Sequence, residues 1–177
     1  MAGLGETLSR KHRGGSGLLL LALLLVLLIV PLWRHRGVNH PLAGKDRLDA
    51  CHLLAPLPPI LASLKTRAGV DNCELLDPDG AAVLSVGFTS NRSIAGGSNH
   101  GTADAYAIWV KEVRASGATE MQEQAGPWKS ATSYRLGTSQ QVLIEDGGLL
   151  IVLTSQRMDL VDLMDYASDL ATELRKL

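Results

Sequence analysis

A run of thirteen apolar residues, nine of them leucine, extends from Leu18 to Val30. A helix that crosses a bilayer usually needs about twenty residues, and about seventeen is the lower end of the range. The run reaches that length when its neighbours from Gly14 to Trp33 are included, with the tryptophan at the headgroup level. It is too apolar for an amphipathic helix that lies on the membrane surface. We therefore expect residues 14–33 to form one transmembrane anchor.

A cleaved signal peptide is the alternative interpretation, because the basic residues Arg10–Arg13 precede the apolar run. The residues that follow it, Trp33–Arg36, are bulky and basic, and no small-x-small cleavage site lies close by. A lipoprotein acylation box at Leu48–Cys51 is rejected because Asp49 does not fit such a box. The flanks therefore favour an uncleaved, single-pass signal anchor.

Charge is distributed unevenly along the chain. Residues 1–37 carry five basic and one acidic side chain, whereas the remainder carries twelve basic and seventeen acidic ones. A basic collar around the anchor suits anionic lipid headgroups. A mildly acidic domain lacks the clustered basic face that phosphate binding needs. We expect the lipid bilayer as a partner and no nucleic acid.

The two cysteines, Cys51 and Cys73, bear on the orientation, which basic residues at both ends of the anchor leave undecided. A lone pair either forms one disulfide in an oxidising compartment or remains as two buried thiols. Cys51 falls in an expected helix and Cys73 opens an expected strand, so a disulfide would staple a helix to a sheet if the Cα atoms lie within about 7 Å. We expect the disulfide, and with it a cytoplasmic N-terminus and a domain outside the inner or plasma membrane.

Four parts of the chain follow from these observations. Residues 1–13 are the cytoplasmic N-terminus, 14–33 the anchor and 34–45 a linker rich in small and polar residues. The remaining residues, 46–177, form one extracytoplasmic (periplasmic or extracellular) domain, because no internal repeat or second linker interrupts them.

Within that domain, hydrophobic periodicity and turn residues predict the elements. Helical spacing with capping residues indicates helices at 46–65 (two short pieces separated by prolines), 103–116 and 159–174. Alternation between turn signals indicates strands at 73–76, 82–89, 128–136, 140–145 and 149–154. The polar segments 90–101 and 118–127 are expected as connections. The order α-β-β-α-β-β-β-α predicts an α+β fold in which helices cover an antiparallel sheet.

This pattern resembles a known group of domains. The resemblance is carried by Asp49-Ala50-Cys51, by Asn72-Cys73-Glu74 at a strand start, by Trp109 on a helix and by the final helix at 159–174. It is similar to extracytoplasmic domains of unknown function in bacterial lipoproteins, which have the fold of the oxygen-evolving-complex subunit PsbP and of Mog1. The resemblance covers residues 46–177 and implies a stapling disulfide and an accessory or binding role, with no active site to carry over.

Candidate site residues gather in the glycine-rich segment before the third helix. Ser98, Asn99 and His100 are expected as binding residues of a long loop, with Trp109 as a possible pocket wall or core residue. A hydrolase-like cluster of Ser98, His100 and Asp104 is an alternative, although no nucleophile elbow precedes the serine. We expect no catalytic residue.

An acidic stripe follows one side of the last helix, and it either docks a basic partner or is the solvated face of an amphipathic helix; its members are Asp159, Asp162, Asp165, Asp169 and Glu173. The histidines show no metal-ligand spacing. We expect no metal and no cofactor.

An anchor attached to a domain without visible chemistry is typical of an accessory protein. We expect a non-enzymatic accessory or interaction protein that belongs to a larger membrane or envelope assembly and therefore has another membrane or envelope protein as its partner. The alternative is an extracytoplasmic module that binds a small ligand.

Overall fold

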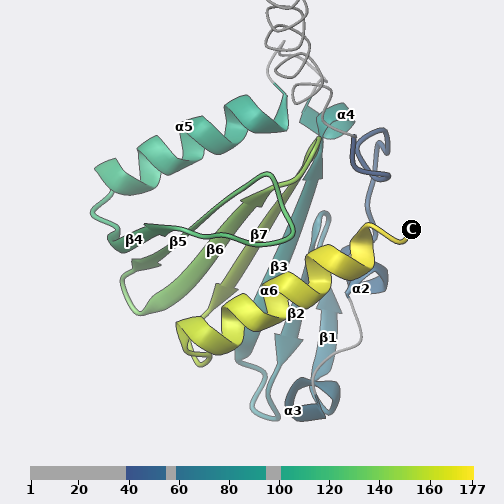
Figure 1. Ribbon diagram of the computed structural model, residues 1–177. Coiled ribbons are helices and arrows are strands. Elements are labelled where there is room, and N and C mark those ends of the chain that lie inside the picture. The colour runs from purple at the N-terminus through teal and green to yellow at the C-terminus, as the bar shows by residue number, and fades with distance from the viewer. Residues whose placement is uncertain (1–38, 55–58, 95–100) are drawn as a thin grey trace, which may run out of the picture. The chain divides into compact units, whose positions relative to one another are not determined.

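One antiparallel sheet organises the part of the chain that the structure, a computed structural model, describes: residues 39–54, 59–94 and 101–177 (Figure 1). Seven strands in these ranges follow the order β1-β2-β3-β7-β6-β5-β4. They are β1 (Lys65–Ala68), β2 (Asn72–Leu76), β3 (Ala82–Ser90), β4 (Thr119–Glu123), β5 (Ser130–Leu136), β6 (Ser139–Glu145) and β7 (Leu149–Ser155). The predicted α+β fold with an antiparallel sheet is confirmed.

Most neighbouring strands are also neighbours in sequence, and short turns connect them. Gly80, Gly137 and Gly148 lie in these turns with φ of 82°, 61° and 101°, a conformation that glycine adopts without a Cβ penalty. The exception is the pairing of β3 with β7, which is continuous from Leu84↔Ser155 to Ser90↔Leu149. This pairing joins the β1–β3 meander to the β4–β7 meander.

The helices in the described ranges cover both faces of the sheet, and they are α2 (Ala50–Leu53), α3 (Pro59–Ala62), α4 (Asn91–Ile94), α5 (Thr102–Ala115) and α6 (Leu160–Leu174). The long helix α6 crosses one face (Figure 1). Its apolar side packs Leu163, Leu170 and neighbouring residues against Phe88 of β3 and Ile151 of β7 in the larger core. Asp159 caps the helix by accepting a hydrogen bond from the amide of Asp162.

The opposite face of β5, β6 and β7 is covered by α5. Successive side chains of a strand point to opposite faces, so Leu143 and Leu150 belong to this second core while their neighbours belong to the first. The predicted apolar stripe of α5, which includes Tyr106, Trp109 and Val113, packs there. The periodicity argument for both long helices is therefore confirmed.

Two edge strands and one helical turn were not predicted. The expected connection at 118–127 contains β4, which pairs with β5 although its side chains are mostly exposed. Glu120 in β4 has φ of 55°, and the register shifts between Thr119 and Gln122. The expected helical segment ends in β1, whose four side chains are all exposed. Backbone hydrogen bonds hold these edge strands in the sheet. Because most of their side chains are exposed, their sequences do not alternate between apolar and polar residues. The third missed element, α4, lies in the expected loop at 90–101.

A disulfide joins α2 to β2. Cys51 and Cys73 are bonded, with their Cα atoms 4.9 Å apart, inside the separation that a disulfide requires. Cys73 is fully buried in the larger core. The predicted staple between a helix and the sheet is therefore confirmed.

The described end of the predicted linker packs onto the domain. Leu42 is buried in the larger core, and the His40 amide donates to the Gly147 carbonyl oxygen in the β6–β7 turn at 2.7 Å. The predicted anchor at 14–33 lies outside the described residues. Within the described ranges, none of the helices combines the length and the apolar character that a bilayer span requires.

Replacing both Cys51 and Cys73 with alanine should lower the free energy of unfolding by about 3 kcal/mol. The bridge spans 22 residues of sequence and restricts the unfolded chain. Urea unfolding of the full chain in detergent measures the loss, and wild type treated with a reductant is the matched control. Thiol titration of the denatured, unreduced chain should find no free thiol, and two free thiols would contradict the bridge.

His40 provides a pH-dependent component of stability at the same end of the domain. The imidazole is 5% exposed; its Nδ1 accepts a hydrogen bond from the Leu42 amide, and its Nε2 has no partner among the described residues. Burial lowers the pKa of His40 below its ordinary value of 6.5. The charge of Asp146 raises this pKa and the charge of Arg175 lowers it, but burial has the largest effect. The folded domain therefore holds the neutral form.

Acidification should lower the free energy of unfolding as the pH falls below about 6.5, because unfolded His40 binds a proton there while folded His40 does not. The stabilisation that neutral His40 gives the folded domain is fully present above that pH. His40→Asn keeps an acceptor for the Leu42 amide without a titrating group, so its unfolding curves should lack this component. Equal losses in both proteins between about pH 7 and pH 5 would assign the effect to other groups.

Candidate functional site

A cavity of about 670 Å³ lies beside the N-terminal half of α6. Its walls come from α6, the Leu61–Leu64 region at α3, the β2–β3 turn and the connection from β7 to α6. The α3 region, the β2–β3 turn and the connection into α6 lie at the same end of the sheet (Figure 1). The volume is within the range of about 300–1,000 Å³ that small-molecule sites occupy. We call this space the α6 cavity.

One set of lining residues is apolar, and we call it the floor of the cavity. It is formed by Leu61, Leu64, Val83, Met158 and Tyr166, each of which belongs to or packs against the larger core. Because core side chains are held by close packing, the cavity floor is part of the folded framework.

Ser155 fixes the connection between β7 and α6. Its hydroxyl donates to the Val83 carbonyl oxygen at 2.6 Å and accepts hydrogen bonds from the amides of Arg157 at 3.2 Å and Met158 at 2.9 Å. Ser155 is buried, so this small network holds three wall residues of the cavity in place.

An ion pair closes one side of the cavity. Arg157 Nη2 lies 2.6 Å from Asp77 Oδ2, and Asp77 Oδ1 accepts a hydrogen bond from the Ala81 amide at 2.8 Å. The Ala81 hydrogen bond and the charge of Arg157 lower the pKa of Asp77, against the raising effect of burial. Asp77 is therefore ionised, and its charge is compensated within the protein.

Three further carboxylates line the cavity from α6: Asp162, Asp165 and Asp169. Their spacing of three and four residues places them on one side of the helix, next to Tyr166. They are exposed, and none forms an ion pair with a described residue. The rest of the predicted acidic stripe has other roles, because Asp159 caps the helix and Glu173 pairs with Lys176.

Tyr166 is the unusual residue of this site. It is 2% exposed, and its hydroxyl has no hydrogen-bond partner among the described residues. Burial raises the pKa of Tyr166 well above its ordinary value, so the phenol stays protonated. A buried hydroxyl without a partner costs about 1–3 kcal/mol. Tyr166 also lines the α6 cavity, so a ligand bound there lies next to this residue.

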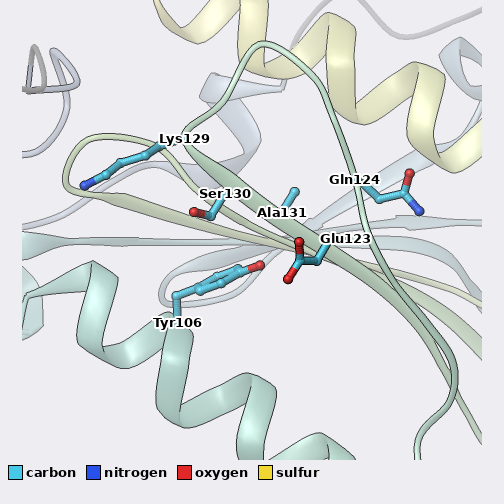
Figure 2. A pocket seen from close by; sticks show the side chains of 6 residues that line it. All are labelled: Tyr106, Glu123, Gln124, Lys129, Ser130 and Ala131. Atoms are coloured by element: carbon cyan, nitrogen blue, oxygen red, sulfur yellow. The ribbon is translucent and has the colours of Figure 1, made fainter. Parts of the chain in front are cut away.

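A second, smaller cavity of about 220 Å³ lies between α5 and the β4–β5 edge. Figure 2 shows Tyr106 reaching from α5 toward Ala131 and Glu123, while Lys129 extends away from them. The Tyr106 hydroxyl lies 2.6 Å from Thr132 Oγ1, and burial raises the pKa of Tyr106. This space is below the usual size of a ligand site, and its tyrosine is already bonded within the protein.

Of the residues predicted as a binding site, Trp109 alone lies in the part of the chain that the structure describes. Ser98, Asn99 and His100 lie outside the described residues. Trp109 is half-buried in the core beneath α5 and lines neither cavity. Within the described ranges, no group of three histidine, cysteine, aspartate or glutamate side chains is placed to hold a metal ion.

Sequence reasoning missed the α6 cavity because four separate segments build it. A signal was present in the acidic stripe, since Asp162, Asp165 and Asp169 flank Tyr166 at helical spacing. That spacing alone does not show whether α3 and the β2–β3 turn face the stripe.

No protein-family model matches the chain, and comparisons with curated proteins and with solved structures found no significant match.

Tyr166→Phe should leave the free energy of unfolding unchanged or raise it by up to about 1 kcal/mol, because it removes a buried hydroxyl that has no partner among the described residues. Tyr106→Phe is the matched control. Its hydroxyl is bonded to Thr132, so its loss should cost about 1 kcal/mol. Urea unfolding of both variants makes the comparison. A loss at Tyr166 as large as that at Tyr106 would show that the Tyr166 hydroxyl is bonded within the protein.

Proposed function

We propose that this chain is a membrane-anchored, extracytoplasmic accessory protein that acts by binding a small ligand in the α6 cavity. The cavity carries the proposal, because it has the volume, the apolar floor and the few convergent polar groups that are typical of ligand sites. The described residues that line it include no histidine, serine, cysteine or lysine. A Ser–His or Cys–His pair or a lysine nucleophile therefore has no side chains among these residues, and we propose ligand binding as the role of the cavity.

The location is part of the same proposal. The Cys51–Cys73 disulfide supports an oxidising compartment, and the apolar run at 14–33 supports a single-pass anchor with its N-terminus inside. The resemblance to lipoprotein domains of the PsbP and Mog1 type agrees with a tethered accessory role. We further propose that the domain serves a larger membrane or envelope assembly, which crosslinking and co-purification from native membranes would test.

Filling the α6 cavity should abolish ligand binding without unfolding the domain. Met158→Trp adds a large ring at a half-buried wall residue. Val161→Trp is the matched control, because Val161 is 68% exposed on α6 and does not line the cavity. A thermal-shift screen of small molecules against the full chain in nanodiscs should give hits with wild type and Val161→Trp that Met158→Trp loses.

Two results of that screen would contradict the proposal. One is the absence of any stabilising compound for wild type. The other is a set of hits that Met158→Trp retains, which would place the binding elsewhere on the protein. Urea unfolding of Met158→Trp would first establish that this variant folds.

A further inference from the structure

The charge of the α6 cavity is one-sided. Four carboxylates line it against a single guanidinium, that of Arg157. Because Arg157 is paired with Asp77, the three carboxylates on α6 remain uncompensated by any described residue. Their combined field disfavours an anionic ligand and attracts a cation.

The apolar floor adds a second requirement. Leu64, Val83 and Met158 offer surface that an ion with a full hydration shell would not cover. The lining also lacks the clustered ligands of a metal site, since no group of three potential metal-ligating side chains lies together in the described ranges. A ligand that matches both the rim and the floor has one charged end and one apolar end.

Tyr166 lies where these two surfaces meet. It flanks Asp162, Asp165 and Asp169 on α6, and it also belongs to the larger core. Its hydroxyl has no partner among the described residues, although the side chain is 2% exposed. A phenol oxygen accepts a hydrogen bond from an ammonium or guanidinium group, and the face of a tyrosine ring attracts a cation.

We propose that the α6 cavity binds a small amphipathic organic cation, with a primary ammonium or guanidinium group at the Asp165 and Asp169 rim and a compact apolar body on the Leu64–Met158 floor. This inference rests on the proposed function, because it names the class of ligand for the same site. The walls held by Ser155 and by the Asp77–Arg157 pair are formed before binding, so little ordering cost opposes it.

The test uses the full chain in nanodiscs of zwitterionic lipid and three probes of one shape. Calorimetry should detect binding of 2-phenylethylammonium, weaker binding of neutral 2-phenylethanol and no binding of anionic 3-phenylpropanoate. Partition of a probe into the lipid is the same for every variant, so differences between variants report the cavity. Raising the salt concentration should weaken the binding of the cation because its partners are exposed.

Neutralising the rim carboxylates should selectively weaken the binding of the cation. The double variant Asp165→Asn/Asp169→Asn should raise the Kd of the cation about tenfold, about threefold for each carboxylate. The Kd of 2-phenylethanol should stay unchanged. The matched control neutralises Glu112 and Asp71, which are exposed and do not line the cavity. It should bind as wild type does. Tyr166→Phe should raise the Kd of the cation severalfold while the domain remains as stable as wild type.

Each other outcome has a separate meaning. Equal binding of cation and alcohol, lost in Met158→Trp, would overturn the cation inference and keep the binding cavity. Cation binding that survives Met158→Trp or the rim substitutions would overturn the inference as well. A short lysine-containing peptide that binds when 2-phenylethylammonium does not would overturn it in favour of a protein segment. Failure of these probes and of the small-molecule screen together would remove the proposed function.

Discussion

The pairing of β3 with β7 is the contact on which the rest of this domain depends. Each half of the sheet is a meander of sequence neighbours, and a small sheet needs a covered apolar face to be stable. The ladder from Leu84↔Ser155 to Ser90↔Leu149 merges them. It creates a surface wide enough for α6 to cover, and the larger core beneath that helix takes side chains from both halves. The disulfide then adds α2 to the edge of this surface.

Local patterning was sufficient for the central elements and insufficient for the edges. The alternation in β3 and β7, with Phe88 and Ile151 facing the same core, predicts strands because burial selects every second residue. The exposed strands β1 and β4 have no such selection, since their hydrogen bonds come from the backbone and most of their side chains face water. Strand order was also beyond the sequence, because pairing between distant segments leaves no local mark.

The candidate site was also predictable from the sequence only in part. The acidic stripe that contains Asp165 and Asp169 is visible from helical spacing. The sequence left two interpretations of it open, a docking surface for a basic partner and a solvated helix face. Only the tertiary arrangement shows that the apolar residues at α3 and Met158 line the same cavity as these carboxylates. The state of Tyr166 was equally hidden, because a tyrosine on an apolar helix face is usually a core residue, and its unpartnered hydroxyl is a property of the packed structure.

The distance in sequence between β3 and β7 also governs how the chain must be made. β3 is complete once Ser90 has left the ribosome, but its partner begins only at Leu149 and α6 comes later still. Until then the backbone groups along one side of β3 and the apolar face beneath α6 are open to the wrong partners. A chain that ends before β7 leaves this edge and this apolar face uncovered, and both favour aggregation.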